Sequence, residues 1–350
     1  MYELAHGVRT LFDFYSDTKT KPSKGMLHSI LNRNFGDEQK DEDTTTLELC
    51  SRVANLLGKE KAVFLPSGTM CNEIAINIHT DPGDEIICES SSHIINFETG
   101  GPAAISSVMI HAIRGKNGIF EAEQLSEAIR KPSRYGPISS LVCVEQTSNM
   151  AGGTIWELEK LNAVAIEAKK YNLNTHMDGA RLLNACIKTG VDAETYSKHF
   201  DSVWLDFSKG LGAPVGAVLA GTEEFISKSW RVKQRLGGAM RQSGVLAAMC
   251  LYALDNNIAR LSTDHKVASF LGSEIEKLET VEQILPVETN IVIFDLSDAT
   301  ISAPNLVQKM EERGFKIGAF GERRIRIVTH LDVDMDAGAK LVEALKIYLK

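Results

Sequence analysis

Two periods of apolar and polar residues run along this chain, and they predict strands and helices in alternation. Short continuous apolar runs are typical of buried strands. They lie at 85–88, 141–145, 203–207 and 216–221, and a further strand is expected at 173–177. Stretches with apolar residues three or four positions apart are typical of amphipathic helices. They lie at 46–57, 157–171, from 223 onward and at 243–255. The first 256 residues are therefore expected to form strands that are separated by helices.

After residue 256 the pattern shortens. A long helix is predicted at 257–278, and strand, helix, strand and helix follow at 290–294, 303–313, 324–328 and 335–349. We interpret this change as the start of a smaller domain. Three parts are predicted: an N-terminal arm at 1–22, a large domain at 23–256 and a small domain at 257–350. With 350 residues the chain is long enough to bury a large core in two domains.

Composition and charge are those of an ordinary globular protein. There are 46 acidic and 38 basic residues, and this net charge of −8 argues against a nucleic-acid partner. No apolar run is long enough to span a bilayer, and the N-terminus lacks the basic and apolar regions of a signal peptide. The six cysteines are scattered without a C-x-x-C pair. We expect a cytoplasmic protein with free thiols, no membrane partner and no metal.

Lys209 is the candidate around which the chemistry is organised. It follows the apolar run 203–207, and the small residues after it, including Gly210 and Gly212, require a tight turn. A lysine partly removed from water is a good nucleophile, because burial favours the neutral amine that attacks a carbonyl. The aldehyde of pyridoxal phosphate (PLP) is such a carbonyl. On this loop alone, a surface lysine in a glycine-rich turn is an equally good explanation.

Two other stretches favour the cofactor. Asp178 follows another apolar strand, and an aspartate at a strand end can pair with the protonated pyridine nitrogen of PLP. Residues 64–72 predict a strand, a tight turn and the start of a helix. The N–H groups around Gly68 and the Thr69 hydroxyl suit a phosphate there. A phosphate turn, an aspartate and a lysine in this order are what a PLP enzyme needs.

These stretches resemble threonine aldolases, which are PLP enzymes of the aspartate aminotransferase fold (fold type I). The motifs are F-L-P-S-G-T-M-C-N at 64–72, M-D-G-A-R at 177–181, S-K-G-L-G-A-P-V-G at 208–216, G-G-A-M-R-Q at 237–242 and V-T-H-L-D-V at 328–333. The resemblance covers nearly the whole chain. It implies an α/β fold: a large domain with a mixed, mostly parallel sheet, and a smaller C-terminal α+β domain.

The resemblance also implies which residues hold the cofactor. They are Gly68, Thr69, His93, Asp178, Arg181, Ser208, Lys209 and Arg241. Lys209 and His93 are the implied catalytic residues. His93 takes the position where the family stacks an imidazole on the PLP ring, and it is our candidate base. Glu98 follows in a loop that shapes the same pocket. Arg241 belongs to a segment that reaches across a subunit interface in the family, which implies a homotetramer, a dimer of dimers, with shared active sites.

Substrate contacts are implied for Ser16, Lys40, Ser148, Arg181 and Arg326. Ser16 matches a family serine that contacts the substrate carboxylate. Arg326 alternates with apolar neighbours in a strand, and an arginine there can clamp an α-carboxylate with both arms of its guanidinium. Simpler explanations remain open: a helix cap for Ser16, a buried salt bridge for Arg181 and a surface position for Arg326.

On the substrate side the chain departs from the family pattern. Lys40 stands in place of a tyrosine, Ser148 in place of a histidine near the substrate hydroxyl, and Tyr15 in place of an arginine. For residues 35–46, a solvated charged loop explains the composition as well as a changed side-chain preference does.

The implied reaction is the cleavage of a β-hydroxy-α-amino acid to glycine and an aldehyde. L-threonine, L-allo-threonine and phenylserine are candidate substrates. Two alternatives stay open. One is β-elimination or deamination of another β-substituted amino acid, for which the changes at Lys40 and Ser148 leave room. The other is a non-catalytic relative that binds PLP, against which the presence of Lys209, Asp178 and Arg326 counts.

Overall fold

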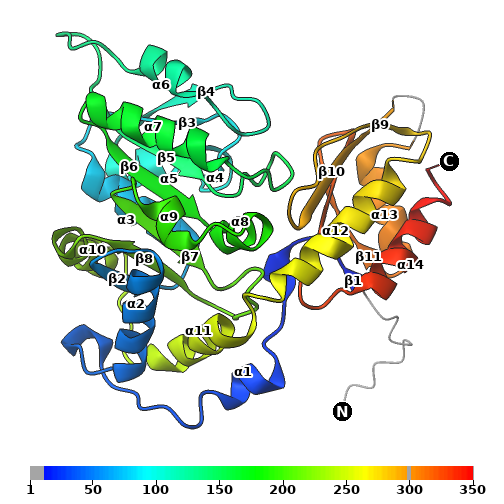
Figure 1. Ribbon diagram of the computed structural model, residues 1–350, viewed down its shortest axis with the longest axis horizontal. Helices are drawn as coiled ribbons and strands as arrows, with labels where there is room; N and C mark the ends of the chain where they lie inside the picture. The colour runs from blue at the N-terminus through cyan, green and yellow to red at the C-terminus, as the bar shows by residue number, and fades with distance from the viewer. Residues whose placement is uncertain (1–11, 298–300, 350) are drawn as a thin grey trace.

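The computed structural model describes residues 12–297 and 301–349. It shows a large α/β part and a smaller part beside it (Figure 1). The chain passes from the first to the second at the turn between α11 (Gly244–Asn256) and α12 (Leu261–Ile275). The boundary proposed at 257 falls in this turn.

A seven-stranded sheet forms the centre of the large part. Its strands are β2 (Lys61–Leu65), β3 (Glu85–Glu89), β4 (Met109–Ile113), β5 (Ser139–Glu145), β6 (Asn174–Gly179), β7 (Ser202–Asp206) and β8 (Ala217–Gly221). Their order is β2-β8-β7-β6-β5-β3-β4, and only β8 runs antiparallel to its neighbours. The carboxyl ends of β5, β6 and β7 therefore lie side by side, which brings Glu145, Asp178 and Asp206 to one edge of the sheet.

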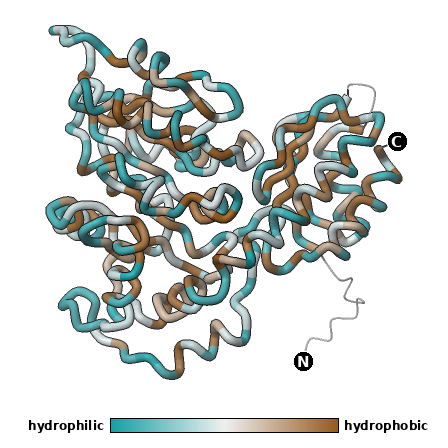
Figure 2. The backbone as a smooth tube through the Cα atoms, viewed as in Figure 1, coloured by the Kyte–Doolittle hydropathy of each residue, from teal (hydrophilic) through white to brown (hydrophobic). Residues whose placement is uncertain are grey.

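Helices cover both faces of this sheet. Along β5, Val142 and Val144 pack into one apolar cluster, whereas Leu141 and Cys143 pack into another. Because successive side chains of a strand point to opposite faces, burial on both faces gives a continuous apolar run. In Figure 2 apolar colour lies along strands of both parts, and it also lies along buried helices. Burial on both faces is why the sequence shows unbroken apolar runs rather than alternation.

The helices of the large part vary in length. They are α1 (Lys24–His28), α2 (Thr44–Leu56), α3 (Gly68–His79), α4 (His93–Asn96), α5 (Gly101–Ser106), α6 (Ala122–Ala128), α7 (Leu158–Lys170), α8 (Leu182–Thr189), α9 (Ala193–Ser197) and α10 (Glu223–Arg235), with the 3₁₀ turns η1 (Asp17–Lys19) and η2 (Glu38–Lys40). Within the described residues, no helix combines the length and the apolar character that a membrane crossing requires.

The small part contains a four-stranded antiparallel sheet in the order β12-β13-β10-β9. Its strands are β9 (Val281–Ile284), β10 (Ile291–Leu296), β12 (Gly318–Phe320) and β13 (Arg324–Val328), and its further helices are α13 (Ala303–Glu312) and α14 (Met335–Leu345). The N-terminal strand β1 (Phe12–Asp13) pairs in parallel with β11 (Phe315–Lys316). The start of the described chain is thereby tied to the small part.

Most predicted elements are present with shifted ends. The strand expected at 173–177 extends through Asp178, because β6 keeps pairing there with Glu145 of β5 and Trp204 of β7. Asp178 is therefore a strand residue near the carboxyl end, not a loop residue. Of the N-terminal arm predicted at 1–22, residues 1–11 lie outside the described residues. The pattern missed β1, β4, β9, β11 and β12, which are short and carry few buried side chains.

Candidate active site

A cleft of about 300 Å³ lies where the carboxyl edge of the large sheet meets the small part. It is lined by Tyr15, Ser16, Thr18, Gly68, Thr69, Asn72, His93, Phe97, Glu145, Asn149, Asp178, Ala180, Arg181, Trp204, Asp206, Lys209, Phe320 and Arg326. Eight of the residues that the sequence marked are in this lining: Ser16, Gly68, Thr69, His93, Asp178, Arg181, Lys209 and Arg326. They come from six separated stretches of sequence and from both parts of the molecule.

Lys209 follows β7 in a tight turn and points into the cleft. Its side chain is 17% exposed, and Nζ lies 3.1 Å from Oδ2 of Asp206. The amine also lies 5.7 Å from the centre of the Trp204 ring. The Gly212 N–H donates to the Lys209 carbonyl at 2.8 Å and closes the turn. The lysine is therefore held inside the molecule by a carboxylate and an indole, which a solvated surface lysine would not be.

Asp178 is held rigidly by buried donors. Its Oδ2 accepts a hydrogen bond from Asn72 Nδ2 at 3.0 Å, and its Oδ1 accepts one from the Ala180 N–H at 3.0 Å. Asn72 is in turn fixed by Trp204 Nε1, which donates to its Oδ1 at 2.7 Å. Burial lowers the pKa of His176 to about 3, so this neutral ring can donate from Nε2 to the same oxygen, 3.1 Å away. Asp178 thus presents a fixed carboxyl group to the cleft.

His93 begins α4 and is held at two points. Its Nδ1 lies 2.7 Å from Oε1 of Glu98, and its backbone N–H donates to Oε2 of Glu145 at 2.8 Å. Burial by itself would lower the pKa of His93, but the Glu98 hydrogen bond and the charges of Asp178 and Glu98 outweigh it and raise the pKa. Because a carboxylate accepts at Nδ1, the nitrogen that can exchange a proton with a bound molecule is Nε2.

Glu145, the last residue of β5, adds a second titratable group to the cleft. Burial, assisted by the nearby Asp178 charge, raises the pKa of Glu145 to about 7. The N–H groups of His93 and Asn149, the latter donating to Oε1 at 2.7 Å, act in the opposite direction. Glu145 therefore holds a proton at a higher pH than an ordinary glutamate does.

The first turn of α3 closes one end of the cleft. Ser67 caps the helix, with its Oγ accepting from the Met70 N–H at 3.3 Å. The N–H groups of a first helical turn have no partner within the helix and form a natural site for an anion. Gly68 is needed because a Cβ at this position would lie 2.1 Å from the Trp204 ring. The glycine lets the helix start directly against the indole, with the Thr69 hydroxyl at the cleft.

Arg181 reaches the cleft, but it is also one half of a buried ion pair. Its Nε and Nη2 donate to the two carboxylate oxygens of Asp17, both at 2.8 Å, and both side chains are buried. Asn290 Nδ2 donates to the same carboxylate at 3.1 Å. Burial by itself would raise the pKa of Asp17, yet the charge and hydrogen bonds of Arg181 hold it well below its usual value. The salt-bridge alternative for Arg181 therefore describes the geometry, and Asp17 joins the N-terminal segment to both parts of the molecule.

Replacing Asp17 with asparagine should lower the free energy of unfolding by about 3 to 5 kcal/mol, because it leaves the Arg181 charge buried and uncompensated. The depressed pKa of Asp17 means that its contribution is complete above about pH 4 and is lost as the pH falls below it. Urea unfolding at pH 7 measures the change. Asp255→Asn is the control, since its pair with Arg52 is exposed, and a loss of less than about 1 kcal/mol is expected. Equal losses in the two variants would contradict the role given to Asp17.

Arg326 of β13 faces the cleft from the small part. Its Nη1 donates to Asn149 Oδ1 at 3.0 Å and its Nη2 to the Tyr15 carbonyl at 3.3 Å. Among the described residues its buried Nε has no hydrogen-bond partner. Burial, together with the Arg181 charge, lowers the pKa of Arg326 to about 10. A buried guanidinium with an unused donor and no carboxylate hydrogen-bonded to it is a site for an incoming anion.

Ser16 both caps a helix and lines the cleft. Its Oγ accepts from the Thr18 N–H at 3.2 Å at the start of η1, as the simpler explanation expected. Thr18 Oγ1 donates to the same oxygen at 2.9 Å. The serine is buried, so its hydroxyl is held at the cleft by the turn that it caps.

Four residues implied by the resemblance do not line the cleft of this chain. The Ser208 N–H and Oγ donate to Asp206 Oδ1 at 2.8 and 2.7 Å, so Ser208 supports the carboxylate beside Lys209. Ser148 is turned away because its backbone bridges to Thr154, and its neighbour Asn149 faces the cleft instead.

Lys40 and Arg241 lie together on another surface. Lys40 is exposed in η2, and the largely exposed Arg241 donates from Nη1 to Asp37 Oδ2 at 2.7 Å. The Glu38 N–H donates to the Arg241 carbonyl at 3.0 Å. Close by, Lys233 forms a fully buried ion pair with Glu38 at 2.8 Å. The sequence analysis did not mark Lys233.

Sequence reasoning missed several residues of the cleft. Asp17, Asn72, Glu145, Asn149, Asp206, Phe97 and Phe320 were not marked. A signal existed for two of them, because Glu145 and Asp206 end strands that neighbour β6, just as Asp178 nearly ends its own. An acidic residue at the end of each of three adjacent buried strands predicts a shared site. Phe320 had no such signal, since it reaches the cleft only through the packing of the small part.

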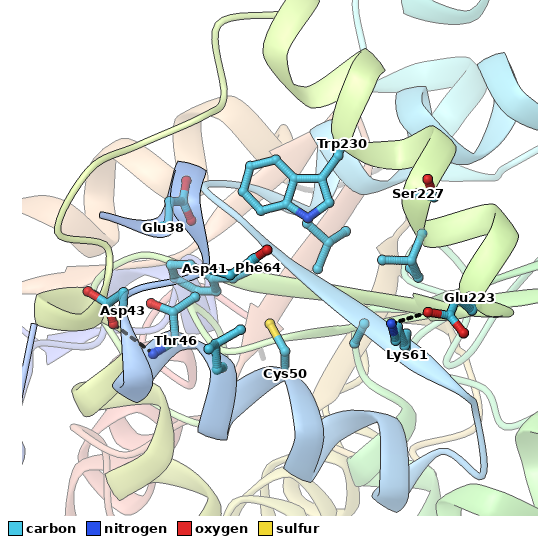
Figure 3. Close-up of a pocket in the computed structure, with 14 residues that line it drawn as sticks. Glu38, Asp41, Asp43, Thr46, Cys50, Lys61, Phe64, Glu223, Ser227 and Trp230 are labelled. Atoms are coloured by element: carbon cyan, nitrogen blue, oxygen red, sulfur yellow. Dashed lines mark hydrogen bonds and ion pairs between the residues drawn. The ribbon is translucent and has the colours of Figure 1, made fainter. Parts of the chain in front are cut away.

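A second cavity of about 390 Å³ lies elsewhere, over the edge strand β2 between α2 and α10. Figure 3 shows Trp230 and Cys50 within it and the ion pair of Lys61 with Glu223 at one end. None of the candidate catalytic, cofactor or substrate residues lines this cavity. The chemistry of the marked residues therefore belongs to the first cleft.

The residues of the first cleft fit PLP by their chemistry. An amine (Lys209) meets an aldehyde, a fixed carboxyl group (Asp178) meets a pyridine nitrogen, and a helix N-terminus with Thr69 meets a phosphate. The unused Nε of the buried Arg326 remains for the carboxylate of an amino acid. These groups line one cavity, which gives each part of a cofactor and substrate pair a partner of suitable charge.

Comparison with known proteins agrees with this fit. Residues 13–299 match the family model described as β-eliminating lyase. A low-specificity L-threonine aldolase of Arabidopsis thaliana is 38% identical, over 91% of this chain and 90% of that protein. An alanine racemase of Cochliobolus carbonum is 33% identical over 97% of this chain and 87% of its own length. A solved threonine aldolase of Leishmania major has the same fold at 19% identity, with a TM-score of 0.82 over 96% of this chain and 99% of that one. The implied fold type I architecture is thereby confirmed.

Proposed function

The chain belongs to the β-eliminating lyase family, within its threonine aldolase group, and we propose that it cleaves L-threonine, L-allo-threonine or a related β-hydroxy-α-amino acid to glycine and an aldehyde. The observation that carries this proposal is the meeting of Lys209, Asp178 and Arg326 in one cleft. Lys209 and Asp178 are the groups that PLP chemistry requires, and Arg326 selects an amino acid by its carboxylate.

Each residue would have a separate task. The α3 N-terminus with Gly68 and Thr69 would hold the cofactor phosphate, and Asp178 would hold the pyridine nitrogen, which it can do because Asn72 fixes its orientation. Arg326, assisted by Ser16, would bind the substrate carboxylate. When bound, PLP supplies an electron sink for the pair released as the Cα–Cβ bond breaks. The carboxylate clamp orients that bond, and orientation is a large part of the rate.

The proton of the β-hydroxyl needs an acceptor when the bond breaks. His93 is the candidate, since Glu98 occupies Nδ1 and leaves Nε2 to take the proton as the hydroxyl becomes the aldehyde carbonyl. Cα then receives a proton, and glycine results. Lys209 is the amine that is placed in the cleft to deliver or remove a proton after substrate is bound, with Asp206 at 3.1 Å to stabilise its charge.

Two other reactions use the same groups. β-Elimination or deamination of another substituted amino acid is favoured by the absence of a histidine at Ser148. Racemisation is favoured by the resemblance to an alanine racemase, because that reaction also needs a lysine at the Cα proton. Both differ from the aldolase reaction in the bond that breaks, so their products distinguish them.

Assembly and compartment are part of the proposal. Lys40 and Arg241 lie outside their own cleft but next to one another, joined through η2 by the hydrogen bonds of Asp37 and Glu38. A shared surface of this kind supports a homotetramer in which one subunit contributes to its neighbour's site. The six cysteines are all free, which supports a cytoplasmic location.

Product analysis tests the reaction. The PLP-loaded protein is incubated with L-threonine, L-allo-threonine and L-phenylserine, and glycine, aldehyde, α-keto acid, ammonia and D-amino acid are measured. We expect glycine and the matching aldehyde in equal amounts. α-Keto acid with ammonia would establish elimination, and the D-amino acid without glycine would establish racemisation. If the PLP-bound protein consumes none of the three amino acids, the alternative of a non-catalytic relative is favoured.

A further inference from the structure

Two buried carboxyl groups face one another behind His93. Glu73 of α3 and Glu98, which precedes α5, are both almost completely removed from solvent. Among the described residues, no donor is hydrogen-bonded to either carboxyl oxygen of Glu73 or to Oε2 of Glu98. The Glu73 side chain is within hydrogen-bonding reach of Glu98. Buried carboxylate oxygens are almost always paired, so this pair needs an explanation.

One shared proton provides that explanation. Two buried carboxyl groups within hydrogen-bonding reach of one another favour a state in which only one is ionised, because like charges at short distance in a buried site repel strongly. Burial and the Glu98 charge raise the pKa of Glu73 to about 8. Glu73 is thus the member that keeps the proton at neutral pH, and its O–H can donate to Glu98. This single hydrogen bond gives partners to both carboxyl groups.

Glu98 connects the carboxyl pair to the active site through hydrogen bonds. Its Oε1 accepts from His93 Nδ1 and from Asn72 Nδ2, each at 2.7 Å. Asn72 uses its other N–H to hold Asp178 at 3.0 Å. Glu98 is therefore the common acceptor for the residues that orient the imidazole and the pyridine partner. A change in the charge of the Glu73–Glu98 pair reaches His93 through one hydrogen bond.

We propose that Glu73 keeps its proton in the working enzyme and donates it to Glu98, and that through Glu98 it fixes the orientation and charge of His93. Glu73 is then a positioning residue, which acts on the reaction without touching the substrate. The link to catalysis rests on the proposed function, whereas the protonation of Glu73 does not. The protonated pair carries one negative charge instead of two, so it holds the His93 proton less tightly and keeps the imidazole available as a base.

Other charges also act on these groups and enter the test. Glu98 is the charged residue that acts on Glu73. The charges of Asp178 and Glu98 favour the protonated form of His93, and the charge of Lys209 opposes it. Glu145 accepts a hydrogen bond from the His93 backbone N–H. Substitutions at Glu73 leave all of these side chains in place.

Three variants separate the proton from the packing. Glu73→Gln keeps the shape and always carries a donor, so it imitates the protonated acid. Glu73→Leu removes the donor. Gly101→Ala leaves Glu73 unchanged but places a methyl group 1.8 Å from its Oε1, which forces the carboxyl group off Glu98. Glu85→Gln is the control, because Glu85 is equally buried but pairs with Arg130 outside the cleft.

Infrared spectroscopy reads the proton directly. In the wild type at pH 7 we expect the carbonyl band of a protonated carboxylic acid, shifted in heavy water and lost as the pH rises through about 8. The spectrum of wild type minus Glu73→Gln should contain this band. The spectrum of wild type minus Glu85→Gln should lack it. A wild-type minus Glu73→Gln spectrum without this band overturns the proposal, whether or not the protein forms glycine.

The effect on His93 is measured by following its pH titration with NMR of ¹⁵N-histidine-labelled protein. The His93→Asn variant assigns the His93 signal. In Glu73→Leu and Gly101→Ala, Glu98 loses a donor and holds the imidazole proton more tightly. We expect the His93 midpoint and the acid limb of kcat/KM to move up by about 0.5 to 1 pH unit. At pH 7 this should lower kcat/KM about three- to tenfold, whereas Glu73→Gln should stay within about threefold of wild type.

Rescue by glutamine distinguishes positioning from packing. If Glu73→Gln and Glu73→Leu both leave the His93 midpoint unchanged, the proposal is wrong. If the band and the His93 shift are observed but the product assay yields no glycine, the carboxyl pair stands and the aldolase reaction fails instead.

Discussion

Replacing Lys209 with alanine is expected to lower kcat for glycine formation from L-threonine by about 10³-fold or more. Two contributions are lost together: the amine that reacts with a carbonyl and the group that can move a proton at Cα. The side chain is only 17% exposed and is held by Asp206, and among the described residues no second lysine lines the cleft to replace it. Single-turnover formation of glycine by the PLP-loaded protein measures the effect.

The control for this loss is Lys19→Ala. Lys19 lies in η1 close to the cleft, with its amine 5.7 Å from the Tyr15 ring, but it does not line the cavity. Its removal should change kcat by less than about threefold, as expected for an exposed charge. If Lys209→Ala retains more than about a tenth of the wild-type kcat, Lys209 is not the reacting amine.

Replacing Arg326 with alanine should act mainly on substrate binding. The guanidinium is buried, and its Nε has no hydrogen-bond partner within the described chain, so it can donate to a carboxylate without giving up its bonds to Asn149 and Tyr15. Loss of charge-assisted hydrogen bonds of about 1.5 to 3 kcal/mol each lowers kcat/KM by about 10² to 10³-fold. Most of this loss should appear as a higher KM for L-threonine.

Two further variants sharpen this result. Arg326→Lys keeps the charge but not the planar fork, and should recover only part of the lost kcat/KM. Arg324→Ala removes an arginine two positions earlier on the same face of β13, where it pairs with Asp295 at 2.7 Å outside the cleft. That control should leave KM unchanged. A KM for Arg326→Ala equal to that of wild type would exclude the carboxylate clamp.

The sequence predicted the fold well where burial is continuous. β5 and β7 are covered on both faces, so each contains a nearly unbroken apolar run that needs no partner to be recognised. β6 is also buried, but its sequence is mostly polar. β12 was missed because two of its three residues are only partly buried. The predicted strand at 173–177 stops before Asp178, whereas β6 includes it. The pairing of β6 with its neighbours continues past the last apolar side chain.

The candidate site was predictable only where local sequence carries the chemistry. Lys209, Asp178 and the start of α3 are recognisable because each combines a special residue with a strand end or a turn. The pairing of Asp17 with Arg181 spans 164 positions, and the bond of Arg326 to Asn149 spans 177. Such contacts depend on how the two parts pack, and the periodicity of a single segment contains no information about them.

The same reason explains why the Glu73–Glu98 pair was not foreseen. Glu73 lies on a helix whose other side chains at 74–76 are apolar and buried, and nothing in the sequence shows that Gly101 leaves room for its carboxyl group. A buried acid on an apolar helix face is visible in a sequence, but its partner is not.

The central claim is that one cleft is built around the amine of Lys209 and holds PLP there. It is tested most directly by reducing the PLP-loaded protein with borohydride and mapping the labelled peptide by mass spectrometry. The account predicts one phosphopyridoxyl group per chain, attached to Lys209 and absent from Lys209→Ala. A label on another lysine, or equal labelling of the wild type and Lys209→Ala, would contradict it.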